Sequence, residues 1–352
     1  MLPVLLGAQQ ATEPPDTTSS LSFYPAALYG DETGFGGGGV LFYLHRTPAH
    51  TPDDAPNSVF VNAIYTANKQ FTGFVRPELL LGRSRWALAA DFKYEFWPDT
   101  FYGLGNSTDL DDAEDFTAET GEVELGFRRK LSATWGVQPM LHWRHWSIQE
   151  REAGGMLATC NVPGACSTNL LGLGLMLRRD DRDNTFNPHR GGLIEAQCLV
   201  YHDALGSDFA WTKYKLDASR FFLLWQNAVL GVQMMGVYND GQPPFLEMAR
   251  PGAELRGVAS LRYLGRHMAL ARGELRVYPF HGELSSRLGF AAFAEAGSVA
   301  NDLDGFALSG MKYSVGGGLR FLLVPQERLA LRVDYGISAD DSAIKITATE
   351  AF

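Results

Sequence analysis

The chain has few of the residues and patterns that mark an enzyme or a helical membrane protein. Only three of its 352 residues are cysteines, and charged residues make up 20% of the total. No apolar run reaches the roughly 18 residues that a membrane-spanning helix needs. The sequence contains no Gly-x-Ser-x-Gly motif, no His-Glu-x-x-His motif and no Cys/His nucleophile arrangement, so we expect no enzymatic activity and no cofactor.

Positive charge is also scarce. Thirty Lys and Arg residues stand against forty Asp and Glu residues, which gives a formal net charge of -10. Proteins that hold a nucleic acid do so largely by neutralising its phosphates, and this chain has the wrong sign of charge for that. We therefore expect no nucleic-acid partner.

The three cysteines suggest one disulfide and no metal site. Cys160 and Cys166 flank a turn-rich spacer, so they can close a small disulfide loop in an oxidising compartment. Cys198 lies alone in a strand-like run, where it is most simply a buried apolar residue. No partner stands at metal-ligand spacing, and His142 and His145 face opposite sides of a strand, so they cannot bind one ion.

Two charged clusters have a simpler explanation than chemistry. Asp181, Arg182 and Asp183 lie near an Asn-Pro and a Gly-Gly pair, where such residues more often organise a turn than a catalytic set. The acidic stretch at 109–115 lacks the glycine and the ligand spacing of a calcium loop, so a solvated loop explains it better than a cation site.

What the sequence does have is a period of two. Polar and apolar residues alternate over 213–219 and 329–336, as they do in strands with two different faces, and no comparable amphipathic helix appears. Glycine (38 residues) and aromatics (12%) also favour β-structure. The alternation and the turn residues predict sixteen strands, at 20–30, 34–46, 57–68, 70–83, 85–97, 115–132, 134–150, 168–181, 190–203, 209–224, 226–239, 267–279, 284–297, 312–323, 328–338 and 343–352.

The lengths of these strands and of their links indicate an outer-membrane barrel. Most strands exceed ten residues, and very short links alternate with long ones at 98–114, 149–167 and 240–266. A soluble sandwich would show the same alternation, but sixteen long strands must close or leave long open edges, which lipid does not tolerate. The link at 47–56 is too long for this scheme.

The predicted fold is therefore all-β, a single 16-stranded antiparallel transmembrane β-barrel with a long inserted loop. We expect one domain at 19–352, embedded in outer-membrane lipid with both ends on the periplasmic side. Residues 1–18 are expected to be a leader remnant or a disordered tether.

Four stretches resemble the barrel of the BamA/TamA family, the bacterial surface-antigen group of outer-membrane assembly and secretion proteins. They are 179–192, with Asp181, Arg182, Asp183, Asn184, Pro188 and Gly191; the tetrapeptide Leu255, Arg256, Gly257 and Val258; the segment 293–297 around Glu295; and 314–336 followed by the terminal Phe352.

The resemblance implies a role for each stretch. The first is a periplasmic turn motif, and Phe352 ends an assembly signal. The loop around Arg256 either caps or enters the barrel by its length alone; the resemblance implies that it enters and that Arg256 meets Glu295 in the lumen. Val258 stands where the family has an aromatic residue, and Glu295 stands where it has Asp.

The resemblance further implies work in outer-membrane protein assembly or translocation. No periplasmic POTRA repeats precede the barrel, so we expect a short member of the family, which acts on client outer-membrane proteins or with a separate periplasmic partner. The strand at 20–30 would meet the short strand at 343–352 in a weak seam that opens sideways. The alternative is a passive pore or a structural barrel without a protein client.

Overall fold

The computed structural model describes residues 19–30, 34–47, 56–82, 85–282, 284–325, 328–339, 341–348 and 350–352. The expected leader or tether at 1–18 lies outside the described residues. So does most of the long link that the sequence places at 47–56.

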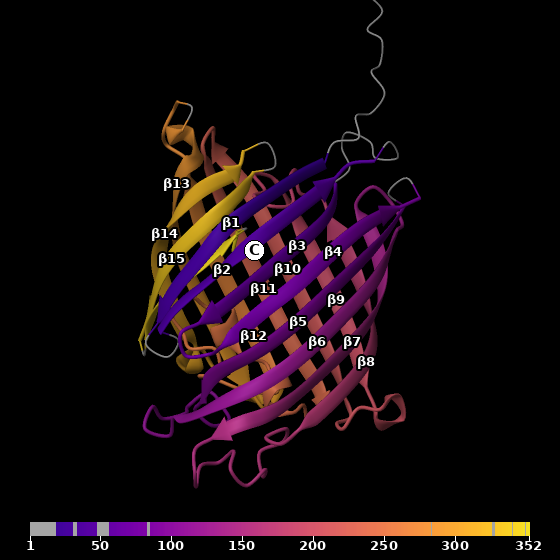
Figure 1. The fold of residues 1–352 in the computed structure, drawn as a ribbon, viewed down its shortest axis with the longest axis vertical. Helices are drawn as coiled ribbons and strands as arrows, with labels where there is room; N and C mark the ends of the chain where they lie inside the picture. The colour runs from indigo at the N-terminus through magenta and orange to yellow at the C-terminus, as the bar shows by residue number, and fades with distance from the viewer. Residues whose placement is uncertain are drawn as a thin grey trace, which may run out of the picture.

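Sixteen antiparallel strands form one sheet that wraps into a barrel (Figure 1). Each strand pairs with the next in the chain, so the order in the sheet is the order in the sequence. The strands are β1 (Ser19–Gly30), β2 (Gly34–His45), β3 (Asn57–Thr66), β4 (Phe71–Leu81), β5 (Trp86–Phe101), β6 (Glu114–Lys130), β7 (Trp135–Arg151), β8 (Thr168–Asp180), β9 (Gly191–Tyr201), β10 (Trp211–Trp225), β11 (Ala228–Gly241), β12 (His267–Val277), β13 (Leu288–Ala300), β14 (Lys312–Val324), β15 (Leu329–Ser338) and β16 (Ser342–Ala348).

Among the described residues, helical structure is confined to single turns in the connections. They are the 3-10 helices η1 (Asp203–Leu205), η2 (Phe245–Glu247), η3 (Pro251–Ala253), η4 (Ser285–Arg287), η5 (Leu303–Gly305) and η6 (Leu308–Gly310). No helix in the described part of the chain is long and apolar enough to cross a bilayer.

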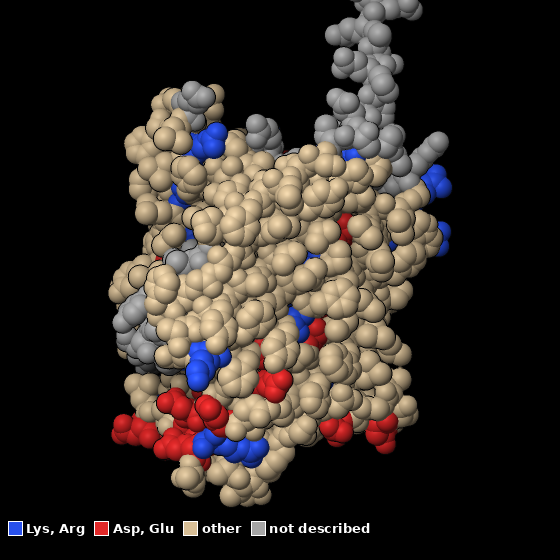
Figure 2. Space-filling view, viewed as in Figure 1, with Lys and Arg blue, Asp and Glu red and all other residues tan. Residues whose placement is uncertain are grey.

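The two faces of the barrel wall follow the alternation in the sequence. On β8, Leu173, Leu175 and Leu177 point outward and are 41–50% exposed. On β13, the side chains of Phe293 and Glu295 point inward and are buried. Figure 2 shows a largely uncharged wall, with acidic side chains gathered toward its lower end. An apolar outer wall around a polar interior is the pattern that lipid requires.

The connections differ in length between the two ends of the barrel. The end with the short links, such as those between β6 and β7 and between β10 and β11, is called here the turn end. The opposite end, the loop end, carries the long links 102–113, 152–167 and 242–266. Several of these long links lie at the bottom of Figure 1. This asymmetry is typical of outer-membrane barrels.

The loop end is closed by apolar side chains. Phe101, Trp146, Leu157, Phe245 and Leu261 are buried in one cluster that joins the wall to the long links 152–167 and 242–266. The ring of Phe245 packs edge-on against that of Phe101, with centroids 5.5 Å apart. Burial of such large apolar side chains stabilises each by about 1.5–3 kcal/mol.

The sheet has two edge strands, β1 and β16. None of the ladders among the described residues joins them. Figure 1 shows the last strands, in yellow, returning to the region of β1, in indigo. β16 pairs only with β15, over Leu331–Ile337.

Three strand boundaries differ from the prediction by four residues, and the others by three or fewer. β16 ends at Ala348 instead of continuing to 352, because the following residues find partners in the lumen. β13 starts at Leu288, four residues later than predicted, because 285–287 form the turn η4. β5 continues past the predicted end at 97, through Pro98, and pairs with β6 as far as Phe101.

Candidate functional site

The loop between β11 and β12, residues 242–266, enters the lumen. Its side chains Leu255 and Leu261 are fully buried, and Arg256 is only 2% exposed. Prolines start η3 and precede η2, which stiffens the loop. Of the two placements that its length allows, the structure shows the inserted one.

Arg256 lies at the innermost part of this loop and contacts three carboxylates. Its Nε donates to Glu295 on β13 at 2.7 Å, and its Nη1 donates to Glu274 on β12 at 2.5 Å and to Asp334 on β15 at 2.8 Å. The backbone N–H of Arg256 donates to the second oxygen of Glu295 at 2.7 Å. The predicted meeting of Arg256 with Glu295 is thus present, and two more carboxylates join it.

The residues beside Arg256 fix the position of the loop tip. The Arg256 guanidinium stacks over the ring of Phe293, with its carbon 3.4 Å from the centroid. Gly257 has φ +84°, and a Cβ there would lie 2.5 Å from the carbonyl carbon of Gly336 on β15. Only glycine allows this backbone conformation and this close approach. The loop tip therefore lies directly on the barrel wall.

Val258 packs into an apolar cluster beside the loop tip. It is 6% exposed, and Leu255, Tyr263, Leu270 and Val299 belong to the same cluster. An aromatic residue is what the resemblance predicts at this position. The aromatic contact to the motif comes instead from Phe293 on the wall.

Two wall arginines extend the charge network. Arg320 on β14 pairs with Asp334 at 2.5 Å and with Glu274 at 3.2 Å, and Arg276 on β12 pairs with Glu274 at 2.8 Å. Both guanidinium groups are at most 1% exposed. Buried charges of this kind persist only when each has a partner of opposite sign. Glu274 and Asp334 therefore keep cationic partners even without Arg256.

Residues 350–352 complete this network from the end of the described chain. Glu350 accepts a hydrogen bond from Arg320 at 2.8 Å. The ring of Phe352 stacks on Phe221 of β10, with centroids 6.0 Å apart, and lies under the guanidinium of Arg272. The sequence predicts that Phe352 ends the last strand; the structure places it inside the barrel. Its role as an assembly signal stays a prediction.

A second anchor ties the loop to the opposite wall. Glu247 of η2 accepts hydrogen bonds from Arg144 of β7 at 2.7 Å and from Lys213 of β10 at 3.1 Å. Glu247 is 5% exposed, and Arg144 also donates to the carbonyl of Leu246 at 3.2 Å. The loop thus crosses the bore, held by Arg256 on β12–β15 and by Glu247 on β7 and β10.

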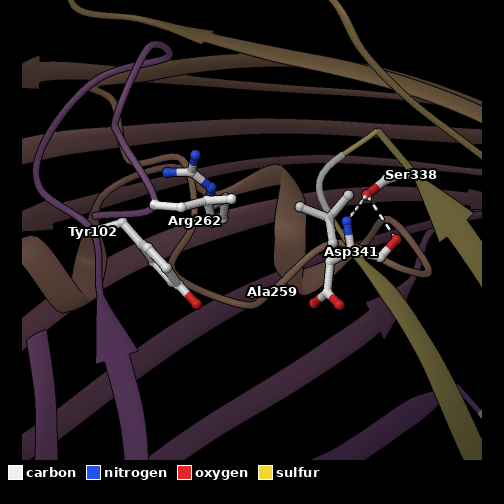
Figure 3. Close-up of a pocket in the computed structure, with 7 residues that line it drawn as sticks. Tyr102, Ala259, Arg262, Ser338 and Asp341 are labelled. Atoms are coloured by element: carbon white, nitrogen blue, oxygen red, sulfur yellow. Dashed lines mark hydrogen bonds between the residues drawn. The ribbon is translucent and has the colours of Figure 1, made fainter. Parts of the chain in front are cut away.

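A third anchor joins the loop to the link 102–113. Arg262 donates to the backbone carbonyl of Thr108 at 2.7 Å and to its hydroxyl. Beside it is a hollow of about 220 Å³ lined by Tyr102, Val258 and Arg262, with Asp341 on the other side (Figure 3). The two links thereby support each other at the loop end.

The turn motif between β8 and β9 is organised by its own side chains. Asp183 accepts hydrogen bonds from the N–H groups of His189 at 2.8 Å and Arg190 at 3.1 Å, and from Arg328 at 2.9 Å. Burial alone would raise the pKa of Asp183. These hydrogen bonds lower the pKa by more than burial raises it, so it lies below its ordinary value. Asp183 is therefore a charged turn residue.

The other residues of the motif serve the same turn. Asn184 accepts from the N–H groups of Phe186 and Asn187, at 2.9 and 2.8 Å. Arg182 donates to the carboxylate of Asp180 at 2.9 Å. Pro188 follows Asn187, and Gly191 has φ +89°, which only glycine adopts easily. These contacts shape the turn, and the expectation that the cluster has no catalytic role stays a prediction.

The cysteines are arranged as the spacing suggests. Cys160 and Cys166 form a disulfide, with their Cα atoms 5.5 Å apart, in the link 152–167. The side chain of Leu157 in the same link is fully buried. Cys198 is free and only partly buried, on β9.

The model of the Omp85 superfamily domain matches residues 57–345, most of the chain. The chain belongs to the Omp85 superfamily. No curated protein sequence matches the chain significantly. Among solved structures, the barrel is similar to BamA from Haemophilus ducreyi lacking POTRA domains 1–3, with a TM-score of 0.60 and 14% identity over 95% of this chain and 70% of that one.

Two further structures share the fold of this Omp85 barrel. CdiB from Acinetobacter baumannii has a TM-score of 0.58 and 12% identity, and covers 94% of this chain and 59% of that one. CdiB from Escherichia coli has a TM-score of 0.57 and 12% identity, and covers 96% of this chain and 62% of that one. The chain thus spans 59–70% of the lengths of these three proteins.

Proposed function

We propose that this Omp85 barrel inserts or translocates client proteins at the outer membrane, and that the client enters at the seam between β1 and β16. The observation that carries the proposal is the pairing of the sheet. Every described strand pairs on both sides except β1 and β16. Unpaired strand edges offer N–H and C=O groups to another strand, which is the chemistry of strand addition.

The β16 side of the seam is short. β16 has seven residues, whereas β6 and β7 have 17 each. Its ladder with β15 runs only from the pair Leu331 and Ala348 to the pair Ile337 and Ser342. This single short ladder holds β16 with fewer hydrogen bonds than hold the longer strands. β16 therefore separates from the sheet at a lower cost in free energy.

The filled bore favours this function over a passive pore. Glu247, Arg256 and Arg262 each bind the inserted loop to a different part of the barrel. Their contacts leave the loop tip buried against β15. A resting barrel of this kind would conduct little, and its seam would be the remaining route for a client.

We further propose that the turn end faces the periplasm and meets clients or a separate periplasmic partner there. The test is purification from native membranes, with and without cross-linking. A periplasmic protein that cross-links to the turn end supports the assignment. Cross-links confined to the loop end contradict it.

The seam is tested by locking it. Single cysteines along β1 and along β16 are joined by a bifunctional maleimide in a Cys198→Ser background, and client folding into liposomes is followed. The control lock joins Leu177→Cys to Ala196→Cys, which lie directly opposite each other on β8 and β9. The locked seam should abolish the acceleration of client folding, while the control lock preserves it.

Conductance separates the two functions. The purified barrel in a planar bilayer should show little steady current, and Arg256→Ala should increase it by releasing the loop tip. A large steady conductance of the unmodified protein, together with full client folding by the locked seam, would overturn the proposal in favour of a passive pore.

A further inference from the structure

The outer wall carries a hollow that the charge network in the lumen does not involve. It lies over β8–β11 and has a volume of about 260 Å³. Ile194, Ala218, Val232 and Met234 line it, with Arg179 and Arg220 at one side. The hollow is therefore apolar with two guanidinium groups at its rim.

Pairing in the sheet explains the shape of the hollow. Ala218 of β10 lies opposite both Ile194 of β9 and Met234 of β11. The small Ala218 side chain thus separates two larger ones on the same outward face. Met234 is 70% exposed, and Ile194 is 36% exposed, so the hollow is open to lipid.

The two arginines and Asp181 give the rim of the hollow a net charge of +1. Arg179 donates to Asp181 at 3.0 Å, and Arg220 lies 3.4 Å from the same carboxylate. Asp181 also accepts the N–H of Gly192 at 2.7 Å, which fixes its position. Two guanidinium groups share one carboxylate, so one positive charge is left for a ligand. The Arg220 side chain is 51% exposed and can reach one.

The position along the barrel matches a lipid headgroup. In the ladder between β7 and β8, Arg179 lies opposite Trp135, which is 40% exposed, at the turn end. Trp225, 55% exposed, ends the strand β10 that carries Arg220, five residues further along the chain toward the turn end. Exposed tryptophans mark the level of the membrane interface, and arginine side chains extend toward it. Phosphates of the turn-end leaflet lie at this height.

We propose that this hollow binds one anionic phospholipid of the turn-end leaflet. The phosphodiester, with one negative charge, lies between Arg179 and Arg220 and accepts hydrogen bonds from both guanidinium groups. An acyl chain lies along Ile194, Ala218 and Val232. The site needs both parts, the paired arginines and the apolar hollow.

Native mass spectrometry of the folded full chain in detergent tests this proposal, with phosphatidylglycerol and phosphatidylcholine added in equal amounts. One phosphatidylglycerol should stay bound. The double variant Arg179→Gln/Arg220→Gln should lower its retention about tenfold, because two exposed ion pairs with the phosphate are lost. Ala218→Trp, which fills the hollow and leaves the arginines, should lower it as well.

The matched control is Arg129→Gln, which changes another turn-end arginine, one stacked on Trp86 of the outer wall. It should leave lipid retention unchanged, and heat-modifiability on gels should show that all variants fold. Equal retention of the two lipids, full retention by Ala218→Trp, or displacement of the lipid by excess inorganic phosphate would each overturn the proposal.

Discussion

Replacing Arg256 by Met tests how the lumen network holds the loop. The substitution leaves Glu274 and Asp334 with other guanidinium partners, whereas the described ion pairs join Glu295 to Arg256 alone. An uncompensated buried charge costs about 3–5 kcal/mol. We therefore expect Arg256→Met to lower the free energy of unfolding by about 4 kcal/mol, mostly through Glu295.

The same substitution should cost less once Glu295 is neutral. In a Glu295→Gln background, Arg256→Met leaves an amide in place of a carboxylate, and a buried unpaired neutral group costs about 1–3 kcal/mol. The two changes should thus be non-additive by about 2 kcal/mol. Urea unfolding of the barrel in lipid vesicles, followed by tryptophan fluorescence, measures all four corners of the cycle.

The control is Arg85→Met, at an exposed position in the link between β4 and β5, outside the network. It should change the free energy of unfolding by less than about 0.5 kcal/mol. If Arg256→Met lowers the free energy of unfolding by the same amount with Glu or with Gln at position 295, the two residues are not coupled. The account of the loop anchor is then wrong.

Three further predictions concern the loop tip, the disulfide and the turn. Gly257→Ala should destabilise the barrel by about 1–3 kcal/mol, because φ is +84° there and the wall leaves no room for a Cβ; urea unfolding checks it, and an unchanged midpoint contradicts it. Replacing Cys160 and Cys166 by Ser should lower stability by about 2 kcal/mol, as expected for a short closed loop, and should speed proteolysis in 152–167; equal cleavage rates would refute it. Because the pKa of Asp183 is lowered on folding, its stabilising effect is present above its unfolded pKa, about 3.9, and is lost as the pH falls through its folded pKa. Asp183→Asn should therefore destabilise at neutral pH and have less effect in acid, and a pH-independent effect would count against this.

The strands could be predicted because period two is a local property of the chain. The alternation in β15 placed Arg332 and Asp334 on one face and Leu331 and Val333 on the other, as the structure has them. The same rule failed at the end of β16. The pattern continues to Phe352, but Glu350 and Phe352 bind Arg320 and the wall near Phe221, which no local pattern encodes.

The site could be predicted only in part. The resemblance pointed to Arg256 and Glu295, and the alternation over 329–336 placed Asp334 on the polar face of its strand. Which cation each carboxylate meets depends on the register and tilt of four strands, and these are set by the whole sheet. Ser314 begins one of the four stretches of the resemblance, but nothing in the sequence predicted that its hydroxyl donates to the carbonyl of Arg256.

The anchors of the loop also bear on how the seam moves. The carboxylates that pair with Arg256 belong to β12, β13 and β15, and none of them belongs to β16. β16 touches the loop tip through Lys345, whose Nζ donates to the carbonyl of Leu255 at 3.3 Å. Outward movement of β16 therefore breaks that one contact with the loop and leaves the ion pairs of Arg256 intact. Under the proposed function, the seam would open while the bore stays filled, and a client strand would be admitted from the side without a leak through the barrel.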